Sequence, residues 1–426
     1  MASSRSLTSR ASCRRLMGAP PVHRRGCLGH RLRPVKGREI RPDAARHGVL
    51  VLGIVTITAY GSWLYSFGVL IGPIHDDAGW GTTALGVAYG AGFLLNGPAS
   101  LLGGRLLDRH GCRGPFLLQA VVGGGFLLAA SWAGHPVVFG VLYALGAGTV
   151  GATGFYHVTT AAAARLRPDR PDRAIARLTM IGALCSAIYL PATAWLVEAW
   201  GWRNAARVLA LTCIAGALLG ATLGTTGRGE EAASRSPWGA MGEALRRPAV
   251  RRMLLVFFLA WMAYTAILGY QVPIMTSAGL ALGTAGVLGG LRGFGQLLGR
   301  VGLTGIVERF GAGPLLRLSY LGSAVGVAFL LVGTVPAGIA YAVLAGASLG
   351  ATSPLQAIYA RTRFAARDLG LLMGLQGLAA GVAGAVGPVL GGLSHDLLDS
   401  WTPTVGLGVA ALVASAVLLH DRPKTP

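Results

Sequence analysis

A short charged segment, GRLLDRHGCR at residues 104–113, lies between two long apolar stretches of the chain. Three of its residues, Asp108, Arg109 and Gly111, have counterparts about 200 residues later, again directly after an apolar stretch. The counterparts are Glu308, Arg309 and Gly311. Duplication of one membrane unit is the simplest explanation of this echo.

The composition points to the lipid bilayer. Of the 426 residues, 53% are hydrophobic and only 12% are charged, whereas soluble domains carry about 25% charged residues. The 66 glycines fit closely packed transmembrane helices, and the nine tryptophans fit helix ends at the membrane interface. We therefore expect an all-α membrane protein.

Stretches without charge predict the helices, because a helix that spans the bilayer needs about 20 apolar residues. Twelve such stretches are present, at residues 48–74, 81–104, 114–134, 136–164, 178–197, 208–227, 253–276, 284–306, 318–335, 336–360, 369–394 and 401–419. We expect two pseudo-symmetric bundles of six transmembrane helices, residues 48–227 and 253–420. A cytoplasmic linker at 228–252 joins them, and tails at 1–47 and 421–426 flank them.

Arginines predict the orientation, because basic loops stay on the cytoplasmic side of a membrane. They gather in every second loop, for example around Arg105, Arg165, Arg251 and Arg361. The other loops carry Asp76, Asp77, Glu198, Asp396 and Asp399, with Arg203 and Arg207 as the basic exceptions. This pattern predicts a multi-pass protein of the inner (plasma) membrane with both termini in the cytoplasm.

Twelve of the 37 basic residues precede His47, in a tail rich in Ser, Arg and Pro. Such a tail could bind nucleic acid, direct import into an organelle or contact anionic lipid. We interpret it as a disordered cytoplasmic tail, with Met17 as an alternative start, and expect no nucleic-acid partner.

The sequence offers little basis for enzyme chemistry. The five cysteines form no disulfide framework. Metal-ligand spacings, phosphate loops and nucleophile elbows are also absent from the sequence. We expect no catalytic residue, no metal and no cofactor.

The internal echo extends along the chain. Pro191 and Pro388 lie 197 residues apart, and Trp202 and Trp401 lie 199 apart. Two six-helix halves would give these offsets, and weak repeats of this kind characterise secondary transporters.

With these features the chain resembles the major facilitator superfamily over about residues 47–420, and the segment at 104–113 matches that superfamily's loop motif G-x-x-x-D-R-x-G-x-R. The resemblance implies a latch in which Asp108 pairs with arginines and a neighbouring helix end while the protein faces outward. The latch would comprise Gly104, Asp108, Arg109, Gly111, Arg113, Glu308 and Arg309. Alternatively, Arg109 and Arg113 only anchor the loop. Thr304 replaces the glycine in the second copy, so the latch should be stronger in the N-terminal half.

Three further segments are similar to the oxalate/formate antiporter and monocarboxylate transporter group. These are YSFGVL at 65–70 followed by AGW at 78–80, LP at 190–191 followed by GWR at 201–203, and GPVLGG at 387–392. The Gly-Pro motif of drug antiporters is missing from the fifth predicted helix, which makes an exporter of hydrophobic drugs or secondary metabolites the second hypothesis.

Ionisable side chains inside a membrane are functional candidates, since each costs about 2.5–3.5 kcal/mol to insert. Arg292, Gln296 and Arg300 follow one another at four-residue spacing in the eighth predicted helix, which would align them on one face. Guanidinium groups bind carboxylates through paired hydrogen bonds. The resemblance places Arg300 at the group's substrate-binding arginine, although it could instead extend to the cytoplasmic interface.

Other positions depart from that group. Gln296 stands where monocarboxylate transporters have an aspartate, Gln376 where the oxalate transporter has a lysine, and Tyr65 near the place of another lysine. Gln271, beside Pro273, is a further candidate for substrate contact, and Tyr264, Tyr270, Ser353 and Gln356 could line the pathway.

No acidic residue lies in the middle of a predicted span, so His157 is the remaining candidate for proton coupling. Alternatively, it is a hydrogen-bonded packing residue. Exchange of anions or facilitated diffusion then becomes more plausible. A membrane sensor or scaffold would need a signalling domain, for which only the N-terminal tail is present.

We therefore predict a monomeric secondary active transporter in the lipid bilayer. It would carry a small, monocarboxylate-like organic anion by alternating access, as an exchanger (antiporter) or symporter. Substrate would contact Arg300, Arg292, Gln296, Gln376, Gln271 and Tyr65.

Overall fold

The computed structural model describes residues 42–223, 242, 244–363 and 369–419, and all regular structure in these residues is helical. The predicted tails lie almost entirely outside the described residues, as do most of the predicted linker, Met17, Cys13 and Cys27. Their predicted roles and boundaries stay predictions.

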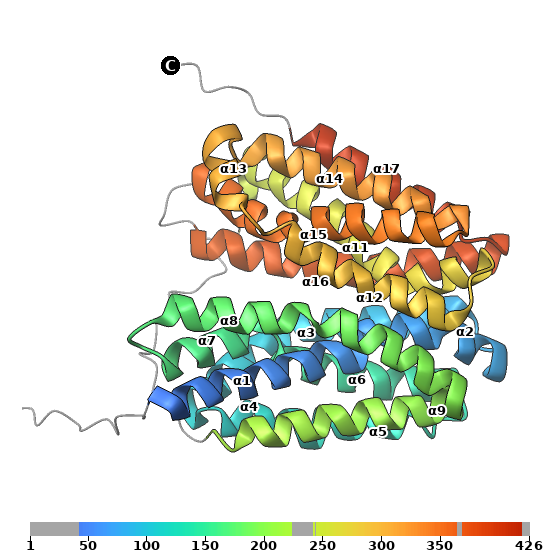
Figure 1. Cartoon of the computed structure of the whole chain (residues 1–426), viewed down its shortest axis with the longest axis horizontal. Helices are drawn as coiled ribbons and strands as arrows, with labels where there is room; N and C mark the ends of the chain where they lie inside the picture. Colours follow the sequence, from blue (N-terminus) through green and yellow to red (C-terminus); the bar gives the residue numbers. More distant parts are fainter. Residues whose placement is uncertain (1–41, 224–241, 243, 364–368, 420–426) are drawn as a thin grey trace, which may run out of the picture. The chain divides into compact units, whose positions relative to one another are not determined.

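The N-terminal half holds the helices drawn in blue to green in Figure 1. They are α1 (Pro42–Ala59), η1 (Tyr60–Tyr65), α2 (Phe67–Ala78), α3 (Thr82–His110), α4 (Arg113–Leu118), η2 (Gln119–Gly124), α5 (Gly125–Ala130), α6 (Pro136–Gly154), α7 (Tyr156–Leu166), α8 (Pro171–Ala183) and α9 (Cys185–Ala221).

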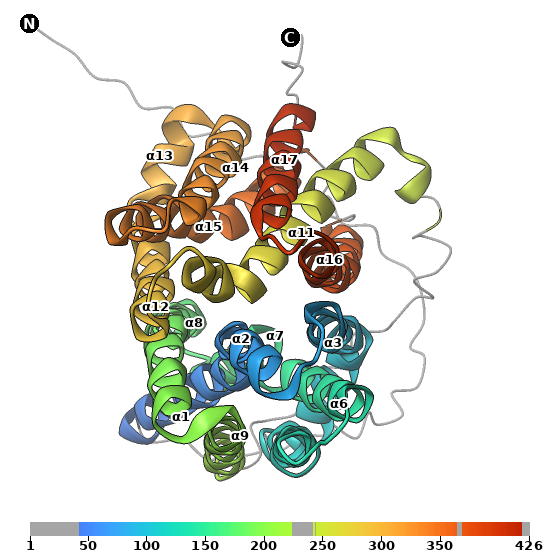
Figure 2. The same ribbon diagram turned by 90° about the vertical axis from the view of Figure 1, so that its right-hand side faces the viewer.

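The C-terminal half holds the helices drawn in yellow to red, and Figure 2 shows the two halves as separate groups. They are α11 (Pro248–Ser277), α12 (Leu282–Leu298), α13 (Leu303–Phe310), α14 (Ala312–Ala328), η3 (Phe329–Val332), α15 (Val335–Arg363), α16 (Leu369–Leu398) and α17 (Thr402–Leu418).

The helices of the described residues can be matched to the twelve predicted spans. Nine helical segments of the described chain are long and apolar enough to cross a bilayer. One of these, Pro171–Ala221, contains two predicted helices, and the 17-residue helices α12 and α17 supply the remaining two. The predicted all-α membrane fold of twelve helices in two bundles is confirmed.

The fifth and sixth predicted helices are joined almost without a loop. Within α9 the chain turns at Gly201, where φ is +74° and ψ is 164°, a conformation that favours glycine. Just beyond the turn, Arg203 donates hydrogen bonds to the carbonyl oxygens of Ser131 and Ala133, 3.1 and 2.9 Å away, and Arg207 donates to the Ser131 hydroxyl at 3.3 Å. These two exceptions to the arginine pattern therefore cap the C-terminal end of α5, where a positive charge is favourable.

The eighth predicted helix, residues 284–306, is broken, and the expectation of one continuous face is wrong. Helix α12 ends at Leu298, and α13 begins at Leu303 after a turn in which Gly302 has a φ of +68°. A side chain at Gly299 would overlap the carbonyl oxygen of Ala347, so α12 and α15 approach closely where α12 ends. Arg292 and Gln296 remain on α12, while Arg300 lies in the turn.

Charged residues distinguish two ends of the helical unit. We name as the basic end the one where the helices carry Arg105, Arg109, Arg165, Arg173 and Arg251. We name as the acidic end the one that carries Asp76, Asp77, Glu198, Asp396 and Asp399. The halves meet through α3 against α16 and α9 against α12.

Candidate functional site

Arg292 is the ionisable side chain most deeply buried among the predicted site residues. It lies on α12, and only 3% of its surface is exposed. Its Nε and Nη2 atoms are buried without a hydrogen-bond partner in the described structure, which also shows no ion pair to Arg292. An unpaired buried charge is costly, so this guanidinium is suited to an anion from outside the protein.

Two predicted residues from opposite halves meet beside Arg292. The Arg292 guanidinium lies 5.9 Å from the centre of the Tyr65 ring. The Tyr65 hydroxyl also lies close enough to the side chain of Gln296, one helical turn beyond Arg292, to interact with it. Tyr65 belongs to η1, a short π-helical turn in the first span, and such turns are frequent at functional sites.

A second polar pair belongs to the same neighbourhood. The Tyr341 hydroxyl of α15 donates to Oε1 of Gln271 of α11 at 2.7 Å, and both residues are buried. Tyr341 is close enough to interact electrostatically with Arg292. We call Tyr65, Gln271, Arg292, Gln296 and Tyr341 the central polar cluster.

Sequence reasoning did not single out Tyr341. It precedes Gln356 by 15 residues on α15, which places it about 60° away around the helix. Helical periodicity from Gln356 would therefore not have identified it.

Arg300 is placed differently from Arg292. Its Nε donates a hydrogen bond to the carbonyl oxygen of Gly350 at 3.3 Å, which ties the turn after α12 to α15. The structure brings Arg300 close enough to Tyr65 for an electrostatic interaction, but gives it a partner that Arg292 lacks. Its role in substrate contact stays a prediction.

Gln376 lies in a chain of hydrogen bonds within the C-terminal half. Its Nε2 donates to Oε1 of Gln356 at 3.1 Å, and Gln356 donates to the Tyr320 hydroxyl at 3.0 Å. The side-chain oxygen of Gln376, Oε1, is buried without a partner in the described residues. No recorded contact joins Gln376 to the central polar cluster within the part of the chain that the structure describes.

Two tyrosines considered as pathway lining have protein partners. The Tyr264 hydroxyl bonds Ser323 at 3.0 Å and Thr352 at 3.1 Å. The Tyr270 hydroxyl donates to the carbonyl oxygen of Pro388 at 2.6 Å. Both hold helices together, whereas Ser353 is exposed on α15.

His157, the candidate for proton coupling, is exposed near the start of α7, directly after the break that separates α6 from α7. Its Nε2 lies 3.0 Å from the carbonyl oxygen of Ala152. This hydrogen bond matches the alternative of a packing residue, and the coupling role stays a prediction.

Asp108, the acidic residue of the predicted latch, is paired with a residue of the N-terminal half to which it belongs. Asp108 forms an ion pair with Arg165 of α7, and Arg165 also donates to the carbonyl oxygen of Leu107 at 3.2 Å. Arg109 and Arg113 are exposed, with Gly111 between them at a φ of +63°. In the second copy Glu308 and Arg309 are exposed, and no ion pair between them is recorded in the described residues. A latch between the halves stays a prediction.

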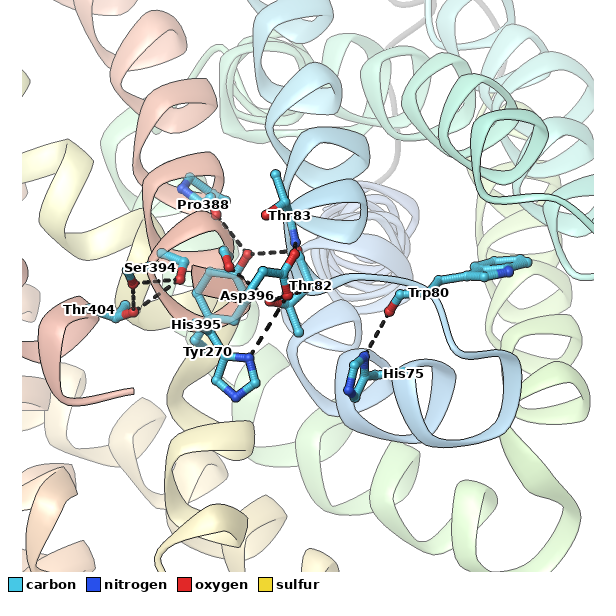
Figure 3. Close-up of polar contacts among 12 residues, drawn as sticks. His75, Trp80, Thr82, Thr83, Tyr270, Pro388, Ser394, His395, Asp396 and Thr404 are labelled. Carbon is cyan, nitrogen blue, oxygen red and sulfur yellow. Dashed lines mark hydrogen bonds and ion pairs between the residues drawn. The ribbon is translucent and has the colours of Figure 1, made fainter. Parts of the chain in front are cut away.

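At the acidic end, two carboxylates join the halves. Asp396 of α16 accepts hydrogen bonds from the backbone N–H groups of Thr82 and Thr83, at 2.9 and 2.8 Å, and from the Thr82 hydroxyl at 2.6 Å (Figure 3). Glu198 of α9 accepts one bond from the backbone N–H of Gly283 at 2.9 Å. Each carboxylate therefore caps the first turn of a helix in the other half.

Glycines show where the halves touch. A side chain at Gly86 or Gly90 of α3 would lie 2.5 or 2.6 Å from carbonyl oxygens of α16. Farther along the same two helices, toward the basic end, Gly97, Gly374 and Gly377 have open space around them. The halves are thus in close backbone contact at the acidic end, whereas no such contact is recorded at these three glycines within the described residues.

The comparisons with known proteins agree with this fold. The family model of the Major Facilitator Superfamily matches residues 51–291 and 253–426. The chain is similar to the solved nucleoside transporter NupG, with a TM-score of 0.72, 12% identity, and coverage of 89% of this chain and 100% of that one.

Two other solved structures show the same likeness. A bacterial homologue of the human lysosomal transporter Spinster, inward-facing and unoccupied, has a TM-score of 0.65 at 14% identity and covers 88% of this chain and 94% of its own. A POT family transporter in complex with 5-aminolevulinic acid has a TM-score of 0.67 at 16% identity and covers 88% and 95%. No curated protein matches the sequence.

Proposed function

The chain belongs to the major facilitator superfamily, and we propose that it moves a small, monocarboxylate-like organic anion across the membrane by alternating access. Secondary transport is the activity that the family and fold carry. The proposal of an organic anion as the substrate goes beyond the family and rests on the residues of the central polar cluster.

One observation carries the anion proposal, namely the buried guanidinium of Arg292 without a partner. A carboxylate could accept two parallel hydrogen bonds from it, for which the unbonded Nε and Nη2 atoms provide the donors. Tyr65 and Gln296 beside it would orient the rest of the substrate. Since Tyr65 and Arg292 belong to different halves, substrate at this position could bias the angle between them.

The same charge favours exchange over net transport. Enclosing Arg292 without an anion leaves a buried, unpaired cation, whereas the loaded protein carries a neutralised pair. The empty protein should therefore change conformation more slowly than the loaded one. An acidic partner that could replace the substrate is not recorded beside Arg292 in the described residues.

We further propose that the basic end faces the cytoplasm of a cell whose inner membrane holds the protein, since arginines favour that side. The contacts at the acidic end and the open space around Gly97 and Gly377 then correspond to an inward-facing arrangement.

Counterflow in proteoliposomes tests the proposal. Labelled formate, acetate, lactate and oxalate are offered to vesicles preloaded with the same unlabelled anion, with and without a pH gradient. We expect a monocarboxylate to exchange, and Arg292→Gln to weaken its uptake by roughly a hundredfold or more, the usual scale for breaking a buried charge pair.

Arg300→Gln is the matched control, because it removes the same charge eight residues away. If Arg300→Gln loses transport while Arg292→Gln does not, the substrate contact belongs to Arg300 and the assignment to Arg292 fails. If no carboxylate moves, or if Arg292→Gln transports like the parent, the anion proposal itself fails. Movement of hydrophobic cations in the same vesicles would support the drug exporter instead. Counterflow that is unchanged by the gradient and by His157→Ala would exclude coupling through His157.

A further inference from the structure

Four arginines surround one pocket at the basic end of the N-terminal half. The pocket is lined by Val49 of α1 and Ala174 of α8 together with Arg167, Arg170, Arg173 and Arg177. Arg167 and Arg170 stand in the turn between α7 and α8, and the other two lie one helical turn apart on α8. The backbone of the turn is fixed by a hydrogen bond from the Arg170 N–H to the Arg167 carbonyl oxygen at 3.1 Å.

Among the described residues, Arg167 is the one arginine of the four that forms a recorded ion pair with a neighbouring acid, Asp169. Arg167 donates from Nε and Nη2 to the two oxygens of Asp169, both at 3.1 Å. These bonds lower the pKa of the Asp169 carboxyl below its usual range, so this pair stays charged at neutral pH. The side chains of Arg170, Arg173 and Arg177 make no recorded hydrogen bond or ion pair within the described residues, and all three are exposed.

Like charges around one pocket repel one another, and an anion between them removes that cost. A phosphate group suits arginine in particular, because its oxygens accept the paired hydrogen bonds that a planar guanidinium donates. The positive-inside rule accounts for arginines in this loop, but not for their convergence on a single pocket.

The surface beside the pocket is apolar and faces outward. Leu50 and Ile54 lie one turn apart on α1 and are 54% and 42% exposed, and Met180 of α8 is 64% exposed. The two helices touch between these side chains, since a side chain at Gly53 would lie 2.7 Å from Ile181. Arg177 lies one turn before Ile181 on α8, so the apolar surface leads away from the arginines toward the middle of the membrane.

We propose that this pocket binds the phosphate of an anionic phospholipid, with the headgroup on Arg170, Arg173 and Arg177 and an acyl chain along Leu50, Ile54 and Met180. Basic pockets beside transmembrane helices are suited to such headgroups. The lipid would hold the start of α8 against α1. It would bind on the outside of the N-terminal half, away from the central polar cluster.

Native mass spectrometry of the full-length protein in detergent micelles tests the proposal. Phosphatidylglycerol or phosphatidylcholine is added, and the retained lipid molecules are counted. We expect phosphatidylglycerol to be retained by the parent and its affinity to fall roughly thirtyfold in Arg173→Gln/Arg177→Gln, the equivalent of two basic side chains at an anionic surface. Arg105→Gln/Arg361→Gln removes two exposed arginines from other helix ends at the same face and should retain the lipid.

Further measurements distinguish a lipid phosphate from free phosphate, and the arginine hydrogen bonds from positive charge alone. Inorganic phosphate in excess should leave the lipid bound, and Met180→Ser should weaken the lipid without changing binding of glycerol phosphate. Arg173→Lys/Arg177→Lys keeps both charges and should recover only part of the affinity, because lysine lacks the paired donors.

Three outcomes would overturn the proposal. Equal losses in the two glutamine double variants would mean that only total charge matters. Displacement of the lipid by inorganic phosphate would assign the pocket to the free ion. Equal retention of phosphatidylcholine would show that the pocket does not select an anionic headgroup. Thermal unfolding of each variant in micelles without lipid verifies that it is folded, and transport failure elsewhere in the protein would not affect this readout.

Discussion

The two carboxylate contacts at the acidic end are counterparts within the duplicated chain, yet they differ in strength. Asp396 and Glu198 lie 198 residues apart, between the offsets of 197 and 199 that separate the paired prolines and tryptophans. Each caps the second spanning helix of the opposite half, α3 or α12. Asp396 accepts three hydrogen bonds, whereas Glu198 accepts one.

The helices that receive the carboxylates explain the difference. Thr82 and Thr83 at the start of α3 correspond to Gly283 and Thr284 at the start of α12, both at an offset of 201. Thr82 supplies a hydroxyl donor that Gly283 lacks. Both residues are exposed, but Glu198 holds its carboxylate on a longer, more flexible side chain than Asp396 does. The two contacts occupy equivalent positions in the repeat, and the different residues at these positions make them unequal.

Of the variants at the two carboxylate contacts, Asp396→Asn should destabilise the closed acidic end most. The amide keeps one acceptor oxygen but places an NH₂ group against a backbone N–H, and it removes the charge that favours the N-terminal end of α3. We expect a loss of about 2 kcal/mol from the closed acidic end, within the range for hydrogen bonds to charged groups.

Hydrogen–deuterium exchange in proteoliposomes measures this loss. Peptides that cover the start of α3 should exchange faster in Asp396→Asn, while peptides at residues 101–110 should become more protected if the basic end closes in return. Asp399→Asn is the matched control, since asparagine tolerates the positive φ of 46° at that residue. Faster exchange at both ends would indicate local loosening and would contradict a shift between two arrangements.

Thr82→Val should come next. Valine keeps the shape of this buried side chain but removes the hydroxyl that donates to Asp396 and also lies 2.9 Å from the carbonyl oxygen of Gly392. Asp396 then keeps only backbone donors, as Glu198 does. The expected cost is about 1 kcal/mol, or roughly a fivefold shift in the open population. The same exchange experiment should place the variant between Asp396→Asn and the parent. An effect as large as that of Asp396→Asn would mean that the charge itself contributes little.

Much of this arrangement could be predicted from the sequence. Charge-free stretches located the spans because an apolar helix must cross the bilayer unbroken by charge, and the Asp108 loop with its copy indicated the duplication. The break after Leu298 escaped prediction, because a chain with 66 glycines does not show which one adopts a positive φ. The absence of a loop at Gly201 escaped for the same reason.

The sequence predicted most residues of the candidate site, but it did not predict which arginine would be buried without a partner. Arg292, Gln296, Gln271 and Tyr65 do gather in one neighbourhood, although the resemblance favoured Arg300. The carbonyl of Gly350 that binds Arg300 is a backbone group, which side-chain patterns cannot reveal. Glu198 and Asp396 were recognised only as acids of the outer loops, although their spacing of 198 already marked them as a pair.

Glu198→Gln should have a smaller effect than either change at the α3 contact. A single bond from an exposed carboxylate to a helix N-terminus contributes about 0.5 kcal/mol, and part of that survives in the amide. Exchange should rise slightly at the start of α12 and stay unchanged at the start of α3. A response as large as that of Asp396→Asn would show that the contacts are equivalent despite their different numbers of hydrogen bonds.

Gly283→Ser should act in the opposite direction and narrow the difference between the contacts. A Cβ atom at Gly283 would lie 3.4 Å from the nearer carboxylate oxygen of Glu198, an ordinary contact distance, so a hydroxyl added there has room to reach the carboxylate. It would supply the donor that Thr82 provides to Asp396, stabilising the closed acidic end by about 0.5–1 kcal/mol. Gly283→Ser should slow hydrogen–deuterium exchange at the start of α12 when Glu198 is present, and should not do so when it is combined with Glu198→Ala. Gly283→Ala, which adds the Cβ without the hydroxyl, separates the new hydrogen bond from the loss of backbone freedom in the unfolded chain. Equal protection in the serine and alanine variants would mean that the hydroxyl makes no such bond and that the asymmetry has another origin.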